Sequence, residues 1–305
     1  MSEVFHTTIL GSSAATPTSL RHTSAQVVQH HNKRFLLDCA EGTQMQLRKY
    51  KLPLMKIDHI FISHLHGDHY LGLPGLLFTY HLLGREKDLH VYAPPGMQQI
   101  IELQYELSQL KPSFNITYHE LHDGKQSIYE DEKISIETML MEHRIPTFGF
   151  LIKEKPLPRK ICKSAIRKFD IPAESMQPIK AGEDFKTKEG RVIANKEITM
   201  DPPAPRSYAF CSDTQYTESF LDQIKGAGLL YHEATFMQDK AEIAREKTHS
   251  TTIEAATLAK KANVKKLLIG HYSARYKELH EFRREAATIF PGTFLAEEGD
   301  VITID

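Results

Sequence analysis

The sequence of 305 residues has few cysteines and no excess of charge of either sign. Its three cysteines, Cys39, Cys162 and Cys211, are isolated, with neither CxxC spacing nor an even count. Such a set argues against a disulfide scaffold and favours a reducing cytoplasm. The 38 Lys and Arg residues nearly balance the 39 Asp and Glu residues. Overall charge therefore neither suggests nor excludes a nucleic-acid partner.

Long hydrophobic runs are also missing. No stretch is long and apolar enough to cross a bilayer. The N-terminal sequence MSEVFHTTILG lacks the charged start and apolar centre of a signal peptide. The apolar fraction of 41% and the charged fraction of 25% are typical of an ordinary globular protein. We therefore expect a cytoplasmic protein that is not bound to a membrane. What the chain does have is histidine, with 17 residues, some of them clustered.

Strand-like and helix-like segments alternate on both sides of one irregular stretch. The predicted strands cover residues 7–11, 25–30, 35–38, 57–63, 89–93 and 134–142. Apolar residues at helical spacing predict two helix faces, one with Ile100, Leu103, Leu107 and Leu110 and one with Leu279, Phe282, Ala286 and Ile289. This alternation is consistent with a layered α/β sandwich that has its helices outside.

The irregular stretch runs from about 153 to 206. It has no sustained apolar period, it contains seven prolines, and it mixes charges throughout. These properties indicate an inserted arm rather than part of the core. The sequence thus predicts a single hydrolase domain over residues 1–305 with this arm as an insertion.

The segment SHLHGDH covers residues 63–69 and directly follows an apolar predicted strand. Imidazole nitrogens and carboxylate oxygens suit borderline cations such as zinc. His64 and His66 are expected to point the same way and hold one ion, while Asp68 and His69 face a second. Gly67 permits the bend that this arrangement needs. The alternative is a histidine-rich surface loop without a ligand, but such loops rarely follow so apolar a strand.

Two such ions need further ligands, and three candidates follow other predicted strands. They are His143, after the strand at 134–142, Asp213, after the strand-like segment YAFCS, and His271, at the end of KKLLIGH. Each one alone is more often structural than a ligand. Their shared position at strand ends, where α/β folds place their sites, favours ligation. Asp213 is the natural bridge, because a carboxylate can give one oxygen to each cation.

These motifs resemble those of the metallo-β-lactamase superfamily and, within it, the ribonuclease Z family, whose members mature tRNA 3′ ends. HLHGDH with its downstream partners identifies only the superfamily, whereas HEATF followed by HSTT is more specific to the nuclease. Further segments follow the family's order over nearly the whole chain: LLDCAEGTQMQLRK, FISHLHGDHYLGLPGLL, HRIPTFGF, FCSDT and GHYSARY.

The resemblance implies a fold and an activity. The fold would be a metallo-β-lactamase-type αββα sandwich with a protruding arm insertion. The activity would be that of a zinc-dependent endoribonuclease, which cleaves precursor tRNA and leaves a tRNA 3′-hydroxyl and a 5′-phosphorylated trailer. A homodimer is implied by the resemblance alone.

The resemblance also implies two Zn²⁺ ions per subunit, with Mn²⁺ or another divalent cation as possible substitutes. One ion would be held by His64, His66 and His143, the other by Asp68, His69 and His271, and both by Asp213.

Four side chains receive catalytic or supporting roles. Asp68 would ligate and also accept a proton from the attacking water. His249, oriented by Glu233, would protonate the leaving oxygen. Asp38 would orient a ligating imidazole. Two of these roles have a plainer alternative. Asp38 could cap the turn or helix before GTQMQL, and the segment around His249 could cap the helix that begins near Thr251.

The start of the arm is rich in cations, which face the single acid Glu154 over sixteen residues. They are Lys153, Lys155, Arg159, Lys160, Lys163, Arg167 and Lys168. Clusters of this kind bind phosphate backbones. The alternative is an ordinary solvated charged face. Because the resemblance places a tRNA-binding arm in this interval, we expect these residues to contact precursor tRNA.

Two rival functions stay open at this point. One is another metallo-β-lactamase-type hydrolase, such as an arylsulfatase or a small phosphodiesterase, which would not need the arm. The other is a catalytically silent RNA-binding or scaffolding protein, which would have no reason to keep every ligand.

Overall fold

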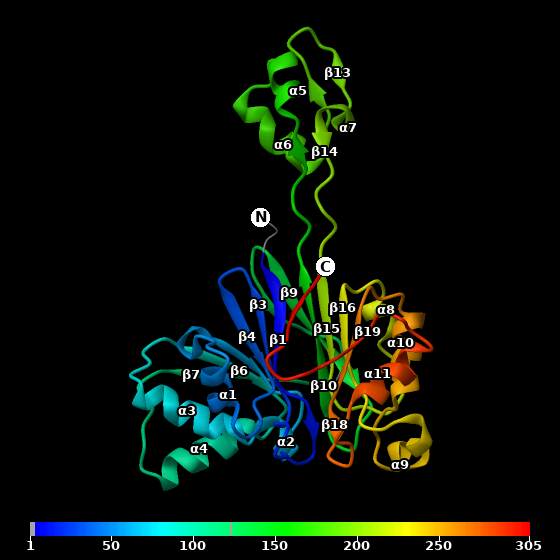
Figure 1. Ribbon diagram of the computed structural model, residues 1–305. Helices are drawn as coiled ribbons and strands as arrows, with labels where there is room; N and C mark the ends of the chain where they lie inside the picture. Colours follow the sequence, from blue (N-terminus) through cyan, green and yellow to red (C-terminus); the bar gives the residue numbers. More distant parts are fainter. Residues whose placement is uncertain (1–3, 123) are drawn as a thin grey trace. The chain divides into compact units, whose positions relative to one another are not determined.

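The computed structural model describes residues 4–122 and 124–305 of the chain (Figure 1). The chain divides into two compact units. The larger unit consists of the residues up to Glu130, Ile136–Ile152 and Ser207–Asp305. The smaller unit consists of Asp131–Ser135 and Lys153–Arg206.

Two seven-stranded sheets form the centre of the larger unit. The first has the order β20 (Val301–Thr303), β1 (Phe5–Gly11), β3 (Ala25–His30), β4 (Lys33–Leu37), β5 (His59–Phe61), β6 (Leu89–Ala93) and β7 (Ile116–Glu120). The second has the order β19 (Thr293–Leu295), β17 (Leu267–Gly270), β16 (Leu229–Glu233), β15 (Ser207–Cys211), β10 (Thr147–Glu154), β9 (Ile134–Met141) and β8 (Ser127–Glu130).

Each sheet contains a block of parallel strands. In the first sheet β4, β5, β6 and β7 pair in parallel. In the second sheet β15, β16, β17 and β19 do the same. Parallel strands end at the same edge of a sheet, so the loops that follow them lie together. A short parallel pair, β2 (Ser13–Ala14) with β18 (Tyr272–Ser273), adds the segment after His271 to this group of loops.

Helices cover the outer face of each sheet (Figure 1). On the first sheet lie α1 (Thr43–Lys49), α3 (Gly72–Leu82) and α4 (Met97–Leu107), which pack on an apolar cluster with strand residues such as Leu36 and Val91. On the second lie α8 (Leu221–Ile224), α10 (Thr252–Lys261) and α11 (His280–Ala287), which pack around Leu230 and Ile269. Two short helices, α2 (Gly67–Tyr70) and α9 (Ala241–Glu246), belong to the loops at the strand ends.

The inner faces of the two sheets meet through aromatic and polar side chains. The rings of Phe61 and Phe150 lie 5.4 Å apart, and Tyr208 donates a hydrogen bond of 2.5 Å to Gln26. The layers are therefore helix, sheet, sheet and helix, and the predicted αββα sandwich is confirmed.

One helix face predicted from the sequence is wrong. In α4 the buried residues are Met97, Ile101 and Tyr105, whereas Leu103 and Leu107 are exposed. The leucines suggested the predicted face, but the helix packs through Met97, Ile101 and Tyr105 on the apolar cluster of the first sheet. The other predicted face holds, because Phe282 and Ala286 of α11 are buried.

The smaller unit has a small apolar core of its own, although its sequence shows no apolar period. Two-stranded sheets pair β11 (Lys160–Ile161) with β14 (Thr199–Met200) and β12 (Phe185–Lys186) with β13 (Val192–Ile193). Three helices complete it, α5 (Lys163–Lys168), α6 (Met176–Ala181) and α7 (Asn195–Ile198). Each element contributes one or two buried residues, such as Ile179 and Phe185, so no single stretch is long enough to display a period.

Among the described residues, no helix is both long enough and apolar enough to span a membrane.

Candidate metal centre

The histidine loop begins two residues after β5. The chain bends at Leu65 and His66, where His66 itself is extended, and α2 begins at Gly67. Gly67 lies against the Leu71 side chain, where an added Cβ would be 2.8 Å from a Leu71 methyl carbon. The bend and the helix start bring His64 and His66 to one side and Asp68 and His69 to the other.

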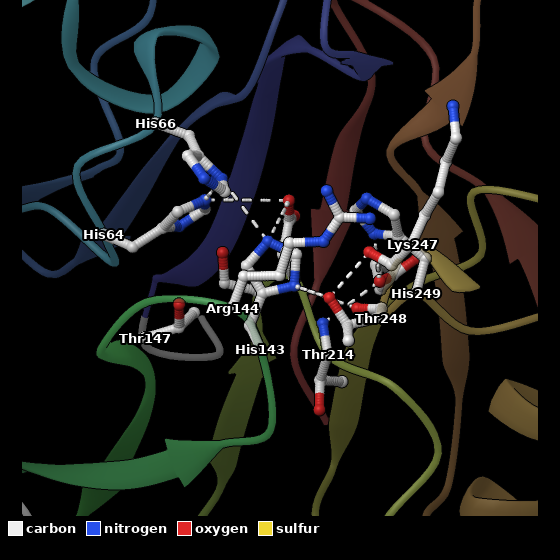
Figure 2. Close-up of polar contacts among 12 residues, drawn as sticks. His64, His66, His143, Arg144, Thr147, Thr214, Lys247, Thr248 and His249 are labelled. Atoms are coloured by element: carbon white, nitrogen blue, oxygen red, sulfur yellow. Dashed lines mark hydrogen bonds and ion pairs between the residues drawn. The ribbon is translucent and has the colours of Figure 1, made fainter. Parts of the chain in front are cut away.

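One group of donor atoms surrounds Asp213 Oδ2. His64 Nε2 lies 3.0 Å from His66 Nδ1, which in turn lies 3.3 Å from His143 Nε2. Asp213 Oδ2 is 3.7 Å from His64 Nε2 and 3.9 Å from His143 Nε2. Figure 2 shows the three imidazoles pointing toward one another.

A second group surrounds the other oxygen of Asp213. Oδ1 lies 3.4 Å from His69 Nε2 and 3.2 Å from His271 Nε2. Asp68 Oδ2 lies 3.6 Å and 3.5 Å from the same two nitrogens. The structure thus brings all seven predicted ligands together, and the carboxylate of Asp213 lies between the two groups.

The donor atoms fit divalent cations. A tetrahedral zinc with bonds of about 2.0–2.1 Å holds its ligand atoms roughly 3.3 Å apart, which is close to the spacing in both groups. His69 Nε2, His271 Nε2 and Asp213 Oδ1 are buried and have no hydrogen-bond partner among the described residues. Buried polar atoms are normally paired, so these three call for an ion at the point where they meet.

Hydrogen bonds from neighbouring residues fix the tautomers of the imidazoles. Asp38 Oδ2 lies 2.7 Å from His69 Nδ1, and Asp38 Oδ1 accepts the Ser63 N–H at 2.8 Å. Thr235 Oγ1 lies 2.9 Å from His271 Nδ1. Because the hydroxyl of Thr235 donates to Glu233 at 2.6 Å, it accepts from His271. In both imidazoles Nδ1 carries the proton, and Nε2 faces the donor group with its lone pair.

Two residues of the site have a strained backbone. Asp38 has φ of 54° and His271 has φ of 60°, values that side chains with a Cβ rarely adopt. Residues in such conformations persist where the surrounding structure enforces them, commonly at functional sites.

The electrostatics of the pocket also favour positive charge. Burial would raise the pKa of Asp68 and Asp213, but the imidazoles of His69 and His271 outweigh burial and hold both carboxyls below their usual range. Burial lowers the pKa of His69, yet Asp213, Asp38 and Asp68 together raise it well above its usual value. The buried carboxylates therefore need a positive charge at this point, which a proton or a divalent cation supplies.

In the group of donor atoms around Asp213 Oδ2, the imidazoles remain neutral. Burial is the main reason why the pKa of His64, His66 and His143 is lowered, and Asp213 opposes it only in part. Neutral imidazole is the form that binds metal ions.

His249 and Glu233 form a pair beside the donor groups. His249 Nδ1 lies 2.7 Å from Glu233 Oε1. Burial would lower the pKa of His249, but the Glu233 carboxylate raises it to about 9. The helix-capping alternative belongs to another residue, because Thr251 caps α10 with its side chain and forms a capping box with Glu254. The predicted caps for Asp38 are likewise not seen, since α1 begins after Gly42.

A cavity of about 390 Å³ opens onto these residues. Asp68, His66, His143, Asp213, His249 and His271 all line it. Two exposed cations, Arg144 and Lys247, stand at its mouth, and both are labelled in Figure 2. The arrangement can hold a phosphodiester against two divalent cations, with a protonated imidazole beside it.

Sequence reasoning missed several residues of this site. Arg144, Lys247, Thr235 and Thr248 each touch the cavity or a ligand, but each adjoins or nearly adjoins a predicted site residue in the chain, which was the available signal. Ala15 gave no signal, because its contribution is a backbone N–H that donates 2.7 Å to Asp68 Oδ2.

The predicted tRNA-binding cations all lie in the smaller unit. Lys160, Lys163, Arg167 and Lys168 are exposed, whereas Lys153, Lys155 and Arg159 are partly buried. Arg159 is committed to internal contacts, since it donates 2.7 Å to Thr199 Oγ1 and pairs with Asp201.

Comparison with known proteins places this site in context. The chain is 42% identical to ribonuclease Z of Bacteroides thetaiotaomicron, over 99% of this chain and 96% of the relative. It is 44% identical to ribonuclease Z of Cytophaga hutchinsonii, over 97% and 95%. The crystal structure of the short form of human tRNase Z superposes with a TM-score of 0.73 at 28% identity, covering 98% of this chain and 99% of that one. The profile of the family described as "Anti-Pycsar protein Apyc1" matches residues 5–165.

Proposed function

The chain belongs to the ribonuclease Z family, and from this we propose that it is the endoribonuclease that cleaves precursor tRNA at its 3′ end. The products would be a tRNA 3′-hydroxyl and a 5′-phosphorylated trailer. The observation that carries this proposal is the clustering of seven ligand-type side chains beside the His249–Glu233 pair, at a cavity that five of the seven and His249 line. The chain also matches its relatives almost end to end.

We assign the ligands as the sequence predicts. One Zn²⁺ would be held by His64, His66 and His143, the other by Asp68, His69 and His271, and both by Asp213; Mn²⁺ or another divalent cation could take the place of zinc. Two such cations supply an ionised water near neutral pH and neutralise charge on the scissile phosphate.

The protein's own groups then hold and move protons. Asp68 Oδ2, which is fixed by the Ala15 N–H, accepts a proton from the attacking water. His249 is protonated at neutral pH because of Glu233, and it donates to the leaving 3′ oxygen. Glu233 can keep this pair in place because Thr214 and Thr235 also donate to its carboxylate. Asp38 acts on the reaction only through His69, which it orients.

Substrate choice would depend on the smaller unit. The exposed cations of α5 and Lys160 supply phosphate contacts that do not depend on sequence. Because Arg159 is partly buried and ion-paired, it contributes to the fold of this unit, and we assign it no more than a peripheral contact.

The alternative is a metallo-β-lactamase-fold hydrolase that acts on small phosphodiesters or aryl sulfates. Such a hydrolase would share the histidine loop, which lies within the residues 5–165 that the other family profile matches. The match ends before Asp213, Glu233, His249 and His271, whereas the ribonuclease Z relatives extend over all four.

The deciding experiment is incubation of the zinc-loaded protein with a precursor tRNA, followed by mapping of both product ends. We expect cleavage at the 3′ side of the tRNA, with a 3′-hydroxyl on the tRNA and a 5′-phosphate on the trailer. Turnover of bis(p-nitrophenyl) phosphate without any cleavage of precursor tRNA would favour the alternative.

We also propose a cytoplasmic homodimer. Family membership supports the dimer, and free cysteines at Cys39, Cys162 and Cys211 support a reducing compartment. Light scattering of the protein as it elutes from a size-exclusion column tests the dimer. Fractionation of the source cells tests the cytoplasmic location.

A further inference from the structure

Thr248 has a backbone conformation that its side chain disfavours. Its φ is 55°, in the left-handed region, where a β-branched residue is a true outlier. The residue belongs to the turn after α9, in which its N–H donates 3.1 Å to the Arg245 carbonyl. No ligand was assigned to this turn from the sequence, so its strain needs another explanation.

The turn is tied to the loop that carries His143. The Thr248 carbonyl lies 2.9 Å from His143 Nδ1, and Thr248 Oγ1 lies 3.0 Å from the same nitrogen. The hydroxyl donates to the Lys247 carbonyl, so toward His143 it presents a lone pair. One residue further along that loop, Arg144 Nη2 donates 3.0 Å to the Glu246 carbonyl. Figure 2 shows His143 and Thr248 in contact, with Arg144 and Lys247 nearby.

These contacts set the state of His143. With two acceptors facing Nδ1, this nitrogen carries the proton, and Nε2 turns its lone pair toward His66 and Asp213. The same turn then continues directly into His249, whose N–H donates 2.9 Å to the Ala244 carbonyl. The rings of His143 and His249 lie only 5.1 Å apart.

We propose that Thr248 is a positioning residue that places His143 and His249 relative to each other. In the left-handed conformation, one residue directs its carbonyl and hydroxyl at a metal-ligating imidazole while the next residue directs its imidazole at Glu233. A single rigid turn therefore holds both His143, in the group of donor atoms around Asp213 Oδ2, and the proton donor His249. The inference rests on the proposed function for the role of His249, but its first half, the orientation of His143, does not.

The Thr248 side chain matters because its hydroxyl faces His143 and because a residue with a Cβ holds the turn more rigidly than glycine would. Glycine adopts positive φ without strain, so Thr248→Gly should fold as well as the parent or better. It would, however, delete the hydroxyl acceptor and allow the carbonyl and His249 to move. Serine keeps the hydroxyl and provides the conservative rescue.

The chain offers a matched control at Asn263. This residue also has positive φ, 51°, in the turn after α10, and its N–H donates 3.1 Å to the Lys260 carbonyl in the same pattern as Thr248. It is exposed and does not line the cavity. Asn263→Gly therefore changes the backbone in the same way without touching the site.

The first measurement is metal retention in competition with a chelator, which needs no turnover. We expect Thr248→Gly to lose one equivalent of zinc at about 10-fold lower chelator concentration than the parent, the lower end of what a lost partner of a ligating histidine causes. Thr248→Ser and Asn263→Gly should match the parent.

The second measurement compares two leaving groups at saturating zinc. A ribose 3′ oxygen needs a proton as it leaves, whereas p-nitrophenolate is stable without one. Displacement of His249 should therefore lower kcat for precursor tRNA more than kcat for bis(p-nitrophenyl) phosphate, and Thr248→Ser should restore the ratio.

The two measurements distinguish a failure of the proposal for Thr248 from a failure of the proposed function. Equal chelator sensitivity and equal kcat ratios for Thr248→Gly and Asn263→Gly would overturn the proposal. If the parent protein cleaves no precursor tRNA, the proposed function fails, but zinc retention still decides whether Thr248 orients His143.

Discussion

The contacts of Asp68 and His249 suggest different tasks for these two side chains, and single substitutions separate the tasks. Asp68 faces His69, His271 and the Ala15 N–H, so it combines ligation with proton acceptance. His249 pairs with Glu233 and is not one of the seven predicted ligands. Loss of the first should therefore remove metal and activity together, and loss of the second should remove activity alone.

We predict that Asp68→Ala abolishes hydrolysis and lowers zinc content, because one ligand and the base disappear together. His249→Ala should keep its zinc and slow precursor cleavage by about 10²–10⁴-fold, the usual contribution of general acid catalysis. Elemental analysis and single-turnover cleavage provide the measurements. A His249→Ala protein with full zinc and parental cleavage would show that His249 is not the acid.

The stability of the protein should depend on pH through His59, a histidine outside the cavity. Burial, helped by the neighbouring His90, lowers the pKa of His59 to about 4, so the folded protein resists its protonation. The unfolded chain takes up this proton near pH 6.5. Between these two values the unfolded state binds more protons, and the free energy of unfolding falls as the pH falls. Above pH 6.5 the group contributes nothing.

We therefore expect His59→Phe, which keeps an aromatic ring against Tyr129, to reduce the loss of stability between pH 6.5 and pH 4. Urea unfolding in the presence of a chelator at both ends of this range measures the effect without interference from metal. His280→Gln, at an exposed histidine, should keep the parental pH dependence. An unchanged dependence in His59→Phe would mean that other groups account for the acid sensitivity.

At the scale of elements, the ends of strands carry most of the site, and this was predictable from the sequence. The strand predicted at 25–30 coincides with β3, and 89–93 with β6. His143, Asp213 and His271 follow β9, β15 and β17, which is why the alternation of apolar strands and polar ends located them. The histidine loop was predictable because its ligands are adjacent in the chain.

Other features depend on contacts between distant elements, and no local pattern reveals them. Which side of α4 is buried depends on how the helix packs on the strands beneath it. The spacing of the leucines therefore predicted the wrong face. The role of Ala15 rests on a backbone N–H that any residue could supply. Because the Thr235 hydroxyl donates to Glu233, its oxygen can accept from His271, and this arrangement depends on the ends of β16 and β17 lying side by side.

The start of α10 provides a test at this scale. Thr251 Oγ1 accepts the Glu254 N–H, and Glu254 Oε2 accepts the Thr251 N–H at 2.8 Å. We predict that Thr251→Ala lowers the free energy of unfolding by about 1 kcal/mol, the usual effect of removing such a cap. Thr251→Ser should lose much less. Equal losses in the two variants, measured by urea unfolding, would point to the methyl group and its packing instead.

At the scale of the whole molecule, two units with separate cores suggest separate tasks. The larger unit contains every ligand-type residue of the cavity, and the smaller unit contains every predicted arm cation. The sequence predicted the sandwich and the position of the insertion through its loss of periodicity. It did not predict the core of the smaller unit, because the buried residues of that core are scattered over many short elements.

We predict that replacing residues 156–205 with a short Gly-Ser linker leaves the larger unit folded. The join would retain Glu154 and Arg206, whose side chains pair at 2.6 Å. Zinc content and bis(p-nitrophenyl) phosphate turnover should stay close to the parental values, while processing of precursor tRNA collapses. Binding of precursor tRNA to the intact protein should weaken steeply with added salt.

A charge variant gives a milder version of this test. The exposed cations of α5 are replaced in K163Q/R167Q/K168Q, and the matched control K225Q/K260Q/K265Q removes three exposed lysines from the larger unit. Only the first should weaken tRNA binding and reduce its salt dependence. Parental processing by the protein without the smaller unit would exclude that unit as the tRNA site.

The wide spread of the cavity residues along the chain also has a consequence in time. About 200 residues separate His69 from His271. At roughly 5–20 residues per second, a ribosome needs about 10–40 s to synthesise the residues between them. With the ligands proposed here, the histidine loop emerges early and waits for partners that are synthesised near the end. The nascent chain therefore completes its metal sites only late in synthesis. A shortage of zinc would affect newly synthesised molecules before it affected mature protein.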